Sequence, residues 1–264
     1  MRILIFPFFL FFFSINIAYS AERISLLLDW FANPDHAPIF IAQNKGFFRE
    51  AGLEVKLIEP ADPSLPPKLV AAGKADLAIS YQPQLQLHVA EGLKITRIAT
   101  LIATPLNSLV VLKDGPIDSI KKLRGKKIGY SVGGFEDILL GAILEKENIG
   151  LDEVQLVNVN FSLTPSLLSG NVDAVIGAFR NFELTQIELA GFQGKAFFLE
   201  EHGIPNYDEL IIIANSKKIK NHAYRQKLIA FVDALERAVT YLINHPEESW
   251  KLFIQDRKDL DTEL

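Results

Sequence analysis

One short pattern occurs in both halves of the sequence and constrains the fold more than any other feature. Residues 69–79 and residues 166–176 each read as a helical stretch that ends at a glycine, followed by an aspartate and an apolar strand. A glycine at that point suits the left-handed cap at the end of a helix. Two copies of the same helix-and-strand unit predict a chain with two similar lobes.

Strands and helices alternate along the rest of the chain. Apolar runs predict strands at 24–28, 53–58, 76–80, 127–131 and 172–176, and helical patterns fall at 37–44, 68–72, 136–146 and 223–242. This alternation predicts the α/β class, with mainly parallel sheets flanked by helices.

The two units also divide the chain into lobes. We expect the chain to cross between lobes near 104–112 and to return near 207–214. Lobe 1 would then comprise 21–106 and 212–264, and lobe 2 would comprise 107–211. The apolar positions of the last long predicted helix have helical spacing, so that helix is expected to pack back on lobe 1.

The first twenty residues have the pattern of a cleavable signal peptide. A positively charged start precedes an apolar run at 3–17, and Ala18 and Ser20 put small residues at the positions that a signal peptidase reads. The run is shorter than the ~20 apolar residues of a membrane span, and Pro7 interrupts it. We therefore expect cleavage after Ser20 and a periplasmic location.

Composition excludes several classes of function. The formal net charge is −5, from 27 Lys and Arg against 32 Asp and Glu, and basic runs are missing, so a nucleic-acid binder is not expected. The absence of cysteine rules out disulfides, a thiol nucleophile and a thiolate metal site. The five histidines are scattered without metal-binding spacing. We expect no metal and no cofactor, and a monomer.

The best enzymatic candidate is a nucleophile motif. Residues 129–133 fit G-x-S-x-G, with Ser131 between a predicted strand and a predicted helix. A hydrolase also needs an acid and a histidine, for which Asp173 and His202 could nominally serve. However, no HGGG-type oxyanion segment precedes the serine, and two lobes do not resemble a single hydrolase sheet. A hydrolase is the weaker interpretation, and no catalytic residue is assigned.

The same loop is better interpreted as a ligand-binding loop. Gly133 and Gly134 would expose backbone N–H groups at the start of a helix, where anionic or carbonyl-bearing groups are attracted. Glycine also allows a ligand to approach closely. In this interpretation Ser131 and Phe135 line a cleft together with the two glycines.

Aromatic and polar residues follow two strands of the first lobe. The segment 29–36 contains Trp30, Asn33 and His36 directly after the first strand, and Tyr81 and Gln82 follow the strand at 76–80. Ligands of α/β folds bind at the carboxyl ends of strands, so these side chains should share a rim. Trp30 is either a flat wall for a planar ligand or an anchor that packs the lobe.

In the second lobe, the segment 177–183 also follows a predicted strand. Its Asn181 and Glu183 are candidates for ligand contacts. Glu183 could accept hydrogen bonds from an amino-bearing ring, with a charge-assisted bond if the ring nitrogen is protonated. The alternative is an acidic side chain that interacts favourably with the N-terminus of a helix.

Together these segments resemble the NMT1/THI5-like and sulfonate/nitrate-type solute-binding proteins. The pieces at 45–48 and 51–55 are shared across that superfamily, whereas 80–84 and 129–136 are similar to the ThiY-type proteins. The resemblance implies a two-lobed periplasmic-binding-protein fold (type II-like). It also implies a protein that delivers an aminopyrimidine thiamin precursor, such as formylaminopyrimidine, to an inner-membrane ABC permease.

The resemblance also implies roles for individual residues. Trp30 and Tyr81 would be the aromatic walls, Glu183 would meet the aminopyrimidine edge, and the backbone of Gly133 and Gly134 would meet the formylamino side. Weaker candidates for ligand contacts are Asn33, His36 and Asn181.

Two other functions remain as alternatives. The cargo could be riboflavin or a sulfonate, although aromatic walls argue against a small sulfonate. The chain could also be an enzyme, because eukaryotic relatives of this fold make the thiamin pyrimidine from a pyridoxal cofactor. Those relatives carry a cysteine-rich motif, and this chain has no cysteine, so an enzyme is not expected.

Overall fold

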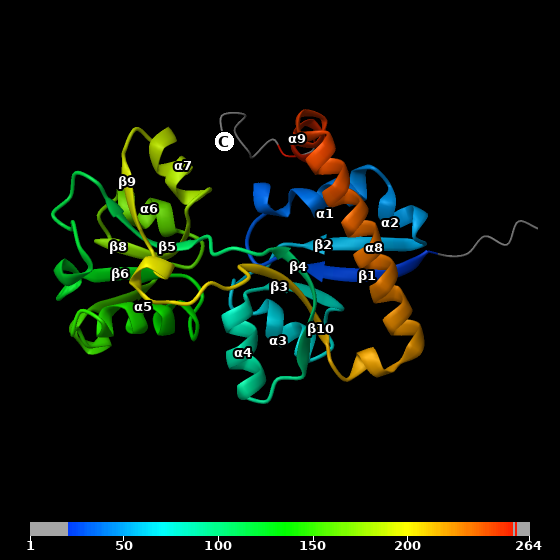
Figure 1. The fold of residues 1–264 in the computed structure, drawn as a ribbon, viewed down its shortest axis with the longest axis horizontal. Helices are drawn as coiled ribbons and strands as arrows, with labels where there is room; N and C mark the ends of the chain where they lie inside the picture. Colours follow the sequence, from blue (N-terminus) through cyan, green and yellow to red (C-terminus); the bar gives the residue numbers. More distant parts are fainter. Residues whose placement is uncertain (1–20, 256, 258–264) are drawn as a thin grey trace, which may run out of the picture.

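The computed structural model describes residues 21–255 and residue 257. The predicted signal peptide at 1–20 and the final residues lie outside the described part. Figure 1 shows two lobes side by side, joined by two stretches of chain that pass between them.

The first lobe is built on a five-stranded sheet with the order β2-β1-β3-β10-β4. Its strands are β1 (Glu22–Leu27), β2 (Leu53–Ile58), β3 (Leu77–Ser80), β4 (Ile95–Ile102) and β10 (Leu210–Asn215). Its helices are α1 (Ala37–Asn44), α2 (Phe47–Glu50), α3 (Pro66–Ala71), α4 (Gln82–Ala90), α8 (His222–Asn244) and α9 (Pro246–Ile254). Strands β1 and β3 pair in parallel, and β1 also pairs in parallel with β2, while β10 is antiparallel to both of its neighbours.

The second lobe repeats this plan with the order β7-β6-β8-β5-β9. Its strands are β5 (Asn107–Leu112), β6 (Lys127–Tyr130), β7 (Gln155–Asn158), β8 (Ala174–Phe179) and β9 (Gly194–Phe198), and its helices are α5 (Glu136–Glu145), α6 (Leu163–Leu168) and α7 (Glu183–Leu189). Here β5 is the antiparallel strand. In each sheet, the antiparallel strand is the one that enters from the other lobe.

The repeated sequence pattern forms the same local structure twice. Helix α3 leads into β3 through Gly73, and α6 leads into β8 through Gly170, and both glycines have φ 73°. That left-handed conformation is costly for residues with a side chain, which explains the glycine in each copy. The prediction of two similar α/β lobes is confirmed.

The return crossing differs in detail from the predicted division of the chain. Strand β10 pairs with β4 over its whole length, including Leu210 and Ile211, and with β3 from Ile211 onward. The sequence-based division put those two residues in lobe 2, which would cut one strand of the first sheet in two. We therefore propose that lobe 2 ends before Leu210.

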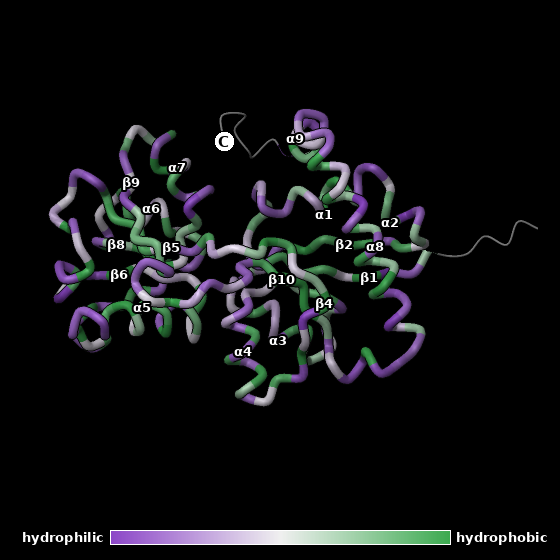
Figure 2. The backbone as a smooth tube through the Cα atoms, viewed as in Figure 1, coloured by the Kyte–Doolittle hydropathy of each residue, from purple (hydrophilic) through white to green (hydrophobic). Residues whose placement is uncertain are grey.

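Helix α8 covers the first sheet as expected from its apolar positions. Its Leu228, Phe231 and Leu235 are buried, and the Phe231 ring stacks on Phe48 of α2 at a centroid distance of 5.0 Å. The helix begins after Asn221, whose side chain accepts a hydrogen bond from the N–H of Tyr224. Figure 2 shows that apolar residues concentrate in the strands at the centre of each lobe.

Within the described residues, no helix combines the length and the apolar character needed to cross a membrane.

Candidate functional site

A small cavity lies between the lobes, where strands of both sheets end. Its lining residues come from both lobes: Asp29, Trp30, Asn33 and Tyr81 from the first, and Glu136, Leu163, Gly177, Phe179, Phe182 and Glu183 from the second. The cavity volume is about 20 Å³, which is room for about one water molecule.

The topology explains why these side chains meet. Trp30 follows β1, Tyr81 follows β3, and Phe179 is the last residue of β8. The carboxyl ends of neighbouring parallel strands share one edge of a sheet, and the two such edges face each other across the cavity. Glu136 and Glu183 are the first residues of α5 and α7, the helices that follow β6 and β8.

In the first lobe, hydrogen bonds hold the carboxylate of Asp29. His36 Nε2 lies 2.9 Å from Asp29 Oδ1, and the Tyr81 hydroxyl donates to Oδ2 at 2.9 Å. His36 Nδ1 accepts a bond from the N–H of Asn33 at 3.2 Å, so Nε2 is the nitrogen that carries the proton. Burial, with Asp29 beside the hydroxyl, raises the pKa of Tyr81 well above its usual value. His36 does not line the cavity, and its contact there is the hydrogen bond to Asp29.

Aromatic rings from the two lobes contact each other at the cavity. The Tyr81 ring stacks on Phe135 of the second lobe, with centroids 5.1 Å apart and planes at 10°. Trp30 packs edge-on against Phe161 at 4.8 Å and joins an apolar cluster formed mainly by second-lobe residues. Trp30 is 8% exposed, and its indole N–H has no hydrogen-bond partner among the described residues. The two interpretations of Trp30 are therefore compatible, because it packs the interface and also lines the cavity.

Two buried carboxyls of the second lobe border the cavity. Glu136 Oε2 accepts hydrogen bonds from the N–H groups of Ser131 at 2.7 Å and Val132 at 3.1 Å. Glu183 Oε2 accepts one from the N–H of Phe179 at 2.6 Å. Burial raises the pKa of each carboxyl to about 8, against the lowering effect of the backbone hydrogen bonds. Glu183 thus sits at a helix start and also borders the cavity.

The structure does not bring Gly133 and Gly134 to the cavity. Both are exposed, and neither is a lining residue. The backbone N–H groups of this loop that point inward, those of Ser131 and Val132, are taken by the carboxylate of Glu136. The expected contact between these glycines and a ligand is therefore not supported in this arrangement.

Four other predicted residues contact neighbouring groups instead of the cavity. The Ser131 hydroxyl donates to the carbonyl of Asn160, so the G-x-S-x-G serine has a structural partner rather than a catalytic base. Gln82 accepts a bond from the N–H of Asp208 at 2.7 Å, which fixes the chain before β10. Asn181 donates to Asp35 across the lobes at 2.7 Å, and Phe135 supports Tyr81.

Several lining residues were not predicted from the sequence. Asp29 lies in the segment that contains Trp30, and Phe179 and Phe182 lie in the segment that contains Glu183, so their neighbours gave a signal. Glu136 was read only as the start of a helix. Its signal is the Phe–Glu pair at the start of both α5 and α7, in which the glutamate is the first helical residue. Gly177 begins the segment that contains Glu183, whereas Leu163 had no such signal.

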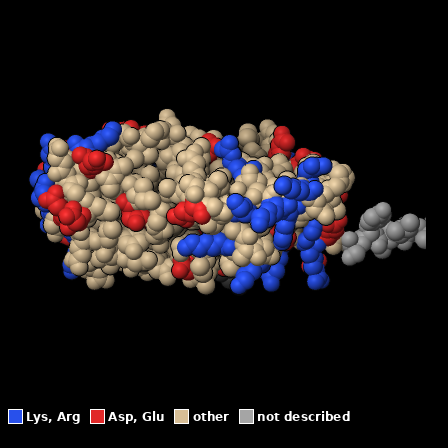
Figure 3. Space-filling model, turned by 90° about the horizontal axis from the view of Figure 1, so that it is seen from below, with Lys and Arg blue, Asp and Glu red and all other residues tan. Residues whose placement is uncertain are grey.

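No Lys or Arg side chain lines the cavity in the described part of the chain. In the view from below, cationic side chains gather on the outer surface of the first lobe (Figure 3). The described residues also contain no group of three or more His, Asp or Glu side chains placed to hold a metal ion. Most of the residues that line the cavity carry a carboxyl group or an aromatic ring.

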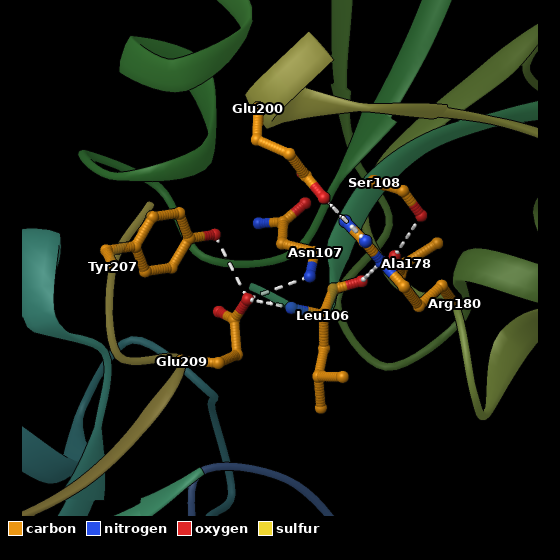
Figure 4. A network of polar contacts seen from close by, with 8 residues as sticks. All are labelled: Leu106, Asn107, Ser108, Ala178, Arg180, Glu200, Tyr207 and Glu209. Atoms are coloured by element: carbon orange, nitrogen blue, oxygen red, sulfur yellow. Dashed lines mark hydrogen bonds and ion pairs between the residues drawn. The ribbon is translucent and has the colours of Figure 1, made fainter. Parts of the chain in front are cut away.

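Outside the cavity lining, the buried carboxyl of Glu209 connects the two crossing segments. Glu209 Oε2 accepts hydrogen bonds from the N–H groups of Leu106 at 2.7 Å and Asn107 at 2.8 Å and from the Tyr207 hydroxyl at 3.0 Å (Figure 4). Burial raises the pKa of Glu209 to about 7, although these hydrogen bonds oppose the rise. One side chain thus ties the outgoing segment to the returning one.

An ion pair of the second lobe lies beside Leu106 in the outgoing crossing segment. Arg180 makes two hydrogen bonds to Glu200, at 2.7 and 2.9 Å, and its backbone N–H donates to the carbonyl of Leu106 at 3.0 Å (Figure 4). Both backbone groups of Leu106 are therefore engaged, one by Glu209 and the other by Arg180. This arrangement limits where the chain can bend between the lobes.

Known proteins share both the sequence and the fold. The model of the family described as NMT1/THI5 like matches residues 33–249. A Haemophilus influenzae protein named for thiamine biosynthesis is 55% identical over 248 residues, which are 94% of this chain and 78% of that protein. A formylaminopyrimidine-binding protein of Halalkalibacterium halodurans is 29% identical over 92% of this chain and 73% of its own length. A 4-amino-5-hydroxymethyl-2-methylpyrimidine phosphate synthase of Saccharomyces cerevisiae is 28% identical over 93% of this chain and 74% of its own.

Solved structures show the fold. The alkanesulfonate-binding protein of Xanthomonas axonopodis pv. citri has a TM-score of 0.69 at 13% identity, covering 89% of this chain and 79% of that one. The periplasmic aliphatic sulphonate binding protein of Escherichia coli has a TM-score of 0.66 at 16% identity, covering 89% and 78%. The expected type II-like, two-lobed periplasmic-binding-protein fold is confirmed. Because the family model spans most of the chain and the thiamine-related relatives agree with it, the chain belongs to the NMT1/THI5-like family.

Proposed function

We propose that the protein is a periplasmic solute-binding protein of an ABC importer, which captures an aminopyrimidine precursor of thiamin between its lobes. The observation that carries the proposal is the lining of the cavity, where aromatic rings and buried carboxyls from both lobes surround one small space. Flat rings favour a planar ligand, and carboxyls favour a ligand with N–H donors.

The charge of the cavity argues against the sulfonate alternative. Asp29, Glu136 and Glu183 line it, and no lining residue is a Lys or Arg in the described part of the chain. An anion buried here at low dielectric would have no cation beside it to compensate its charge. An aminopyrimidine instead offers hydrogen-bond donors and a basic ring nitrogen.

Binding, rather than catalysis, is the role we propose. The formylaminopyrimidine-binding relative is named for binding, while the yeast relative at 28% identity is named as a synthase. In this chain the Ser131 hydroxyl is hydrogen bonded to a backbone carbonyl, and the sequence has no cysteine for the motif of the eukaryotic enzymes. A pyridoxal absorbance band in the purified protein would favour the enzyme instead.

The size of the cavity indicates how a ligand would enter. A volume of about 20 Å³ is far below the roughly 300 Å³ or more of small-molecule sites. We propose that the lobes separate by bending at the two crossing segments and close again around the ligand. The closed protein would then dock on an inner-membrane permease, after export directed by the predicted signal peptide.

The contact residues that we propose for the ligand are those that line the cavity and were expected from the sequence: Trp30, Asn33, Tyr81 and Glu183. His36, Gln82, Ser131, Phe135 and Asn181 are proposed to hold these residues or the closed lobes in place, through the contacts described above.

Calorimetric titration with formylaminopyrimidine tests the proposal. We expect saturable one-to-one binding, with no heat from taurine and none from an alkanesulfonate. Riboflavin belongs in the same series, because aromatic walls would also accept a flavin. Absence of binding to any thiamin precursor would overturn the ligand, and tight binding of a sulfonate would contradict the reasoning from charge.

A further inference from the structure

Two neighbouring strands of the second lobe end in the same way. Strands β6 and β8 are adjacent and parallel, and each is followed by a turn, a phenylalanine and a glutamate that begins the next helix. The pairs are Phe135–Glu136 and Phe182–Glu183. Two carboxyls, one after β6 and one after β8, therefore lie at the same cavity.

The two carboxyls are held alike. In Glu136, Oε2 accepts two backbone N–H bonds from the turn before α5, and in Glu183, Oε2 accepts one from Phe179 at the end of β8. The Glu183 carboxyl also accepts a hydrogen bond from its own backbone N–H. These bonds fix the direction of the two carboxyls, and a carboxyl has further lone pairs that can accept bonds from a ligand.

Gly177 packs closely against the carboxyl of Glu136. A Cβ atom at Gly177 would lie 2.4 Å from Glu136 Oε1, so any side chain at this position would displace the carboxyl. Gly177 has φ 97°, and its N–H donates to the Asn107 side chain at 3.0 Å. Strand β8 thus leaves room at Gly177 for the carboxyl of Glu136, and both residues line the cavity.

A separate observation indicates that a ligand supplies the missing partners. The Trp30 indole N–H lacks an acceptor among the described residues, although the side chain is more than nine-tenths buried and lines the same cavity. A buried donor without a partner is costly. A ligand with an acceptor for Trp30 and donors for the carboxyls would satisfy both.

We propose that Glu136 is a second ligand-binding carboxyl, and that Glu136 and Glu183 each accept one N–H bond from the primary amino group of a heteroaromatic ligand. This inference rests on the proposed function and deepens it. It assigns the specificity for the amino group to a pair of side chains rather than to Glu183 alone. A ring with a carbonyl in place of the amine would point an acceptor at both carboxyls.

The electrostatics of the pair support this arrangement. The titratable groups that influence Glu136 are Glu183 on α7, Glu209 directly before β10, and the hydroxyls of Tyr81 and Tyr207, and no cation is among them. Burial together with these neighbours raises the pKa of Glu136 to about 8. N–H donors from a ligand are the groups that would stabilise its charged form.

The test compares two ligands on two proteins. The probes are 4-amino-5-hydroxymethyl-2-methylpyrimidine and its 4-oxo analogue, and the variant is Glu136→Gln. A glutamine oxygen can still accept the N–H bonds of Ser131 and Val132, so the fold should be kept. Equal thermal unfolding temperatures would verify this. Glu145→Gln, an exposed carboxyl on the same helix, is the matched control and should bind like the wild type.

We expect Glu136→Gln to weaken binding of the amino compound by about ten- to a hundredfold, because glutamine cannot form the carboxylate that the ligand's N–H donors would stabilise. Binding of the 4-oxo analogue should stay the same or improve, because the glutamine amide can donate to its carbonyl. The ratio of the two affinities, which measures the preference for the amino compound, would therefore fall. Equal weakening of both compounds would show a packing role, and unchanged binding would show no role. Either result would overturn the inference.

The two proposals fail in distinguishable ways. If the wild-type protein binds neither compound and no other thiamin precursor, the proposed function itself is wrong. If it binds the amino compound and Glu183→Gln loses that preference while Glu136→Gln keeps it, the function stands and the pair is wrong. Calorimetry at pH 7 measures all of these affinities.

Discussion

Three glutamates are almost completely buried around the cavity and the crossing segments. Glu136, Glu183 and Glu209 are 4%, 5% and 0% exposed. Burial raises their pKa values to about 8, 8 and 7, against about 4.3 for a glutamate in an unfolded chain. Below the unfolded pKa the folded and unfolded states are equally protonated. Between the unfolded and folded values, the folded protein holds more protons.

The free energy of unfolding should therefore fall as the pH rises from about 5 to about 8. Ionising these carboxyls costs more in the folded protein than in the unfolded chain, so their stabilising contribution is lost as the pH passes through the folded values. Urea unfolding of the ligand-free protein at several pH values measures the trend.

Glu209→Gln provides the control for this pH dependence. Glutamine can still accept the bonds from Leu106, Asn107 and Tyr207 but does not titrate. The variant should lose less stability between pH 5 and pH 8 than the wild-type protein. An identical slope in both proteins would show that Glu209 ionises as easily in the folded state as in the unfolded state.

The repeated unit of helix, glycine and strand is the element that defines both lobes. Gly170 ends the stretch after α6 with φ 73°, and a Cβ atom there would meet nothing within 4 Å. The cost of a side chain at this position is therefore conformational, about 1–2 kcal/mol for the left-handed region.

We expect Gly170→Ala to lower the free energy of unfolding by about 1 kcal/mol. Gly141→Ala is a matched control of opposite sign. Gly141 lies inside α5, and its added Cβ would make an ordinary contact with Leu151 at 3.9 Å. Alanine should stabilise that helix by roughly 0.5–1 kcal/mol. Urea unfolding of both variants checks the pair, and a neutral Gly170→Ala would contradict the role of the cap.

Local patterns were enough to predict several elements. Helix α1 and strand β2 have the predicted bounds, because side-chain periodicity and flanking glycines are properties of the segment itself. Strand β8 was expected at 172–176 but spans Ala174–Phe179. Its extension passes through Gly177, where pairing with β5 shifts register, and this depends on contacts with distant segments.

The same distinction holds for the site. Trp30, Tyr81 and Glu183 follow apolar strands, so their place on the rim could be predicted. Glu136 was missed because its carboxyl folds back on the preceding turn, while Gly133 and Gly134 were expected at the ligand and lie exposed. Which residues of a turn face inward depends on packing between lobes, and sequence spacing does not contain that information.

At the scale of the whole molecule, the lobes are in contact across the cavity. Tyr81 stacks on Phe135, and Asp35 accepts a hydrogen bond from Asn181 at 2.7 Å. Burial raises the pKa of Asp35 although Asn181 opposes the rise. In the proposed cycle, ligand entry separates these groups, and closure brings the two lobes together around the ligand. Binding and lobe closure are therefore coupled in this account.

Trp30 provides a direct probe of the central claim, that an aminopyrimidine binds between the lobes. The sequence has two tryptophans, Trp30 and Trp250, and only Trp30 lines the cavity. In Trp250→Phe, tryptophan fluorescence therefore reports on the cavity alone. We predict a saturable change in Trp30 emission on titration with formylaminopyrimidine and no change with taurine. An emission spectrum that stays constant up to the highest soluble concentration of formylaminopyrimidine would contradict the account.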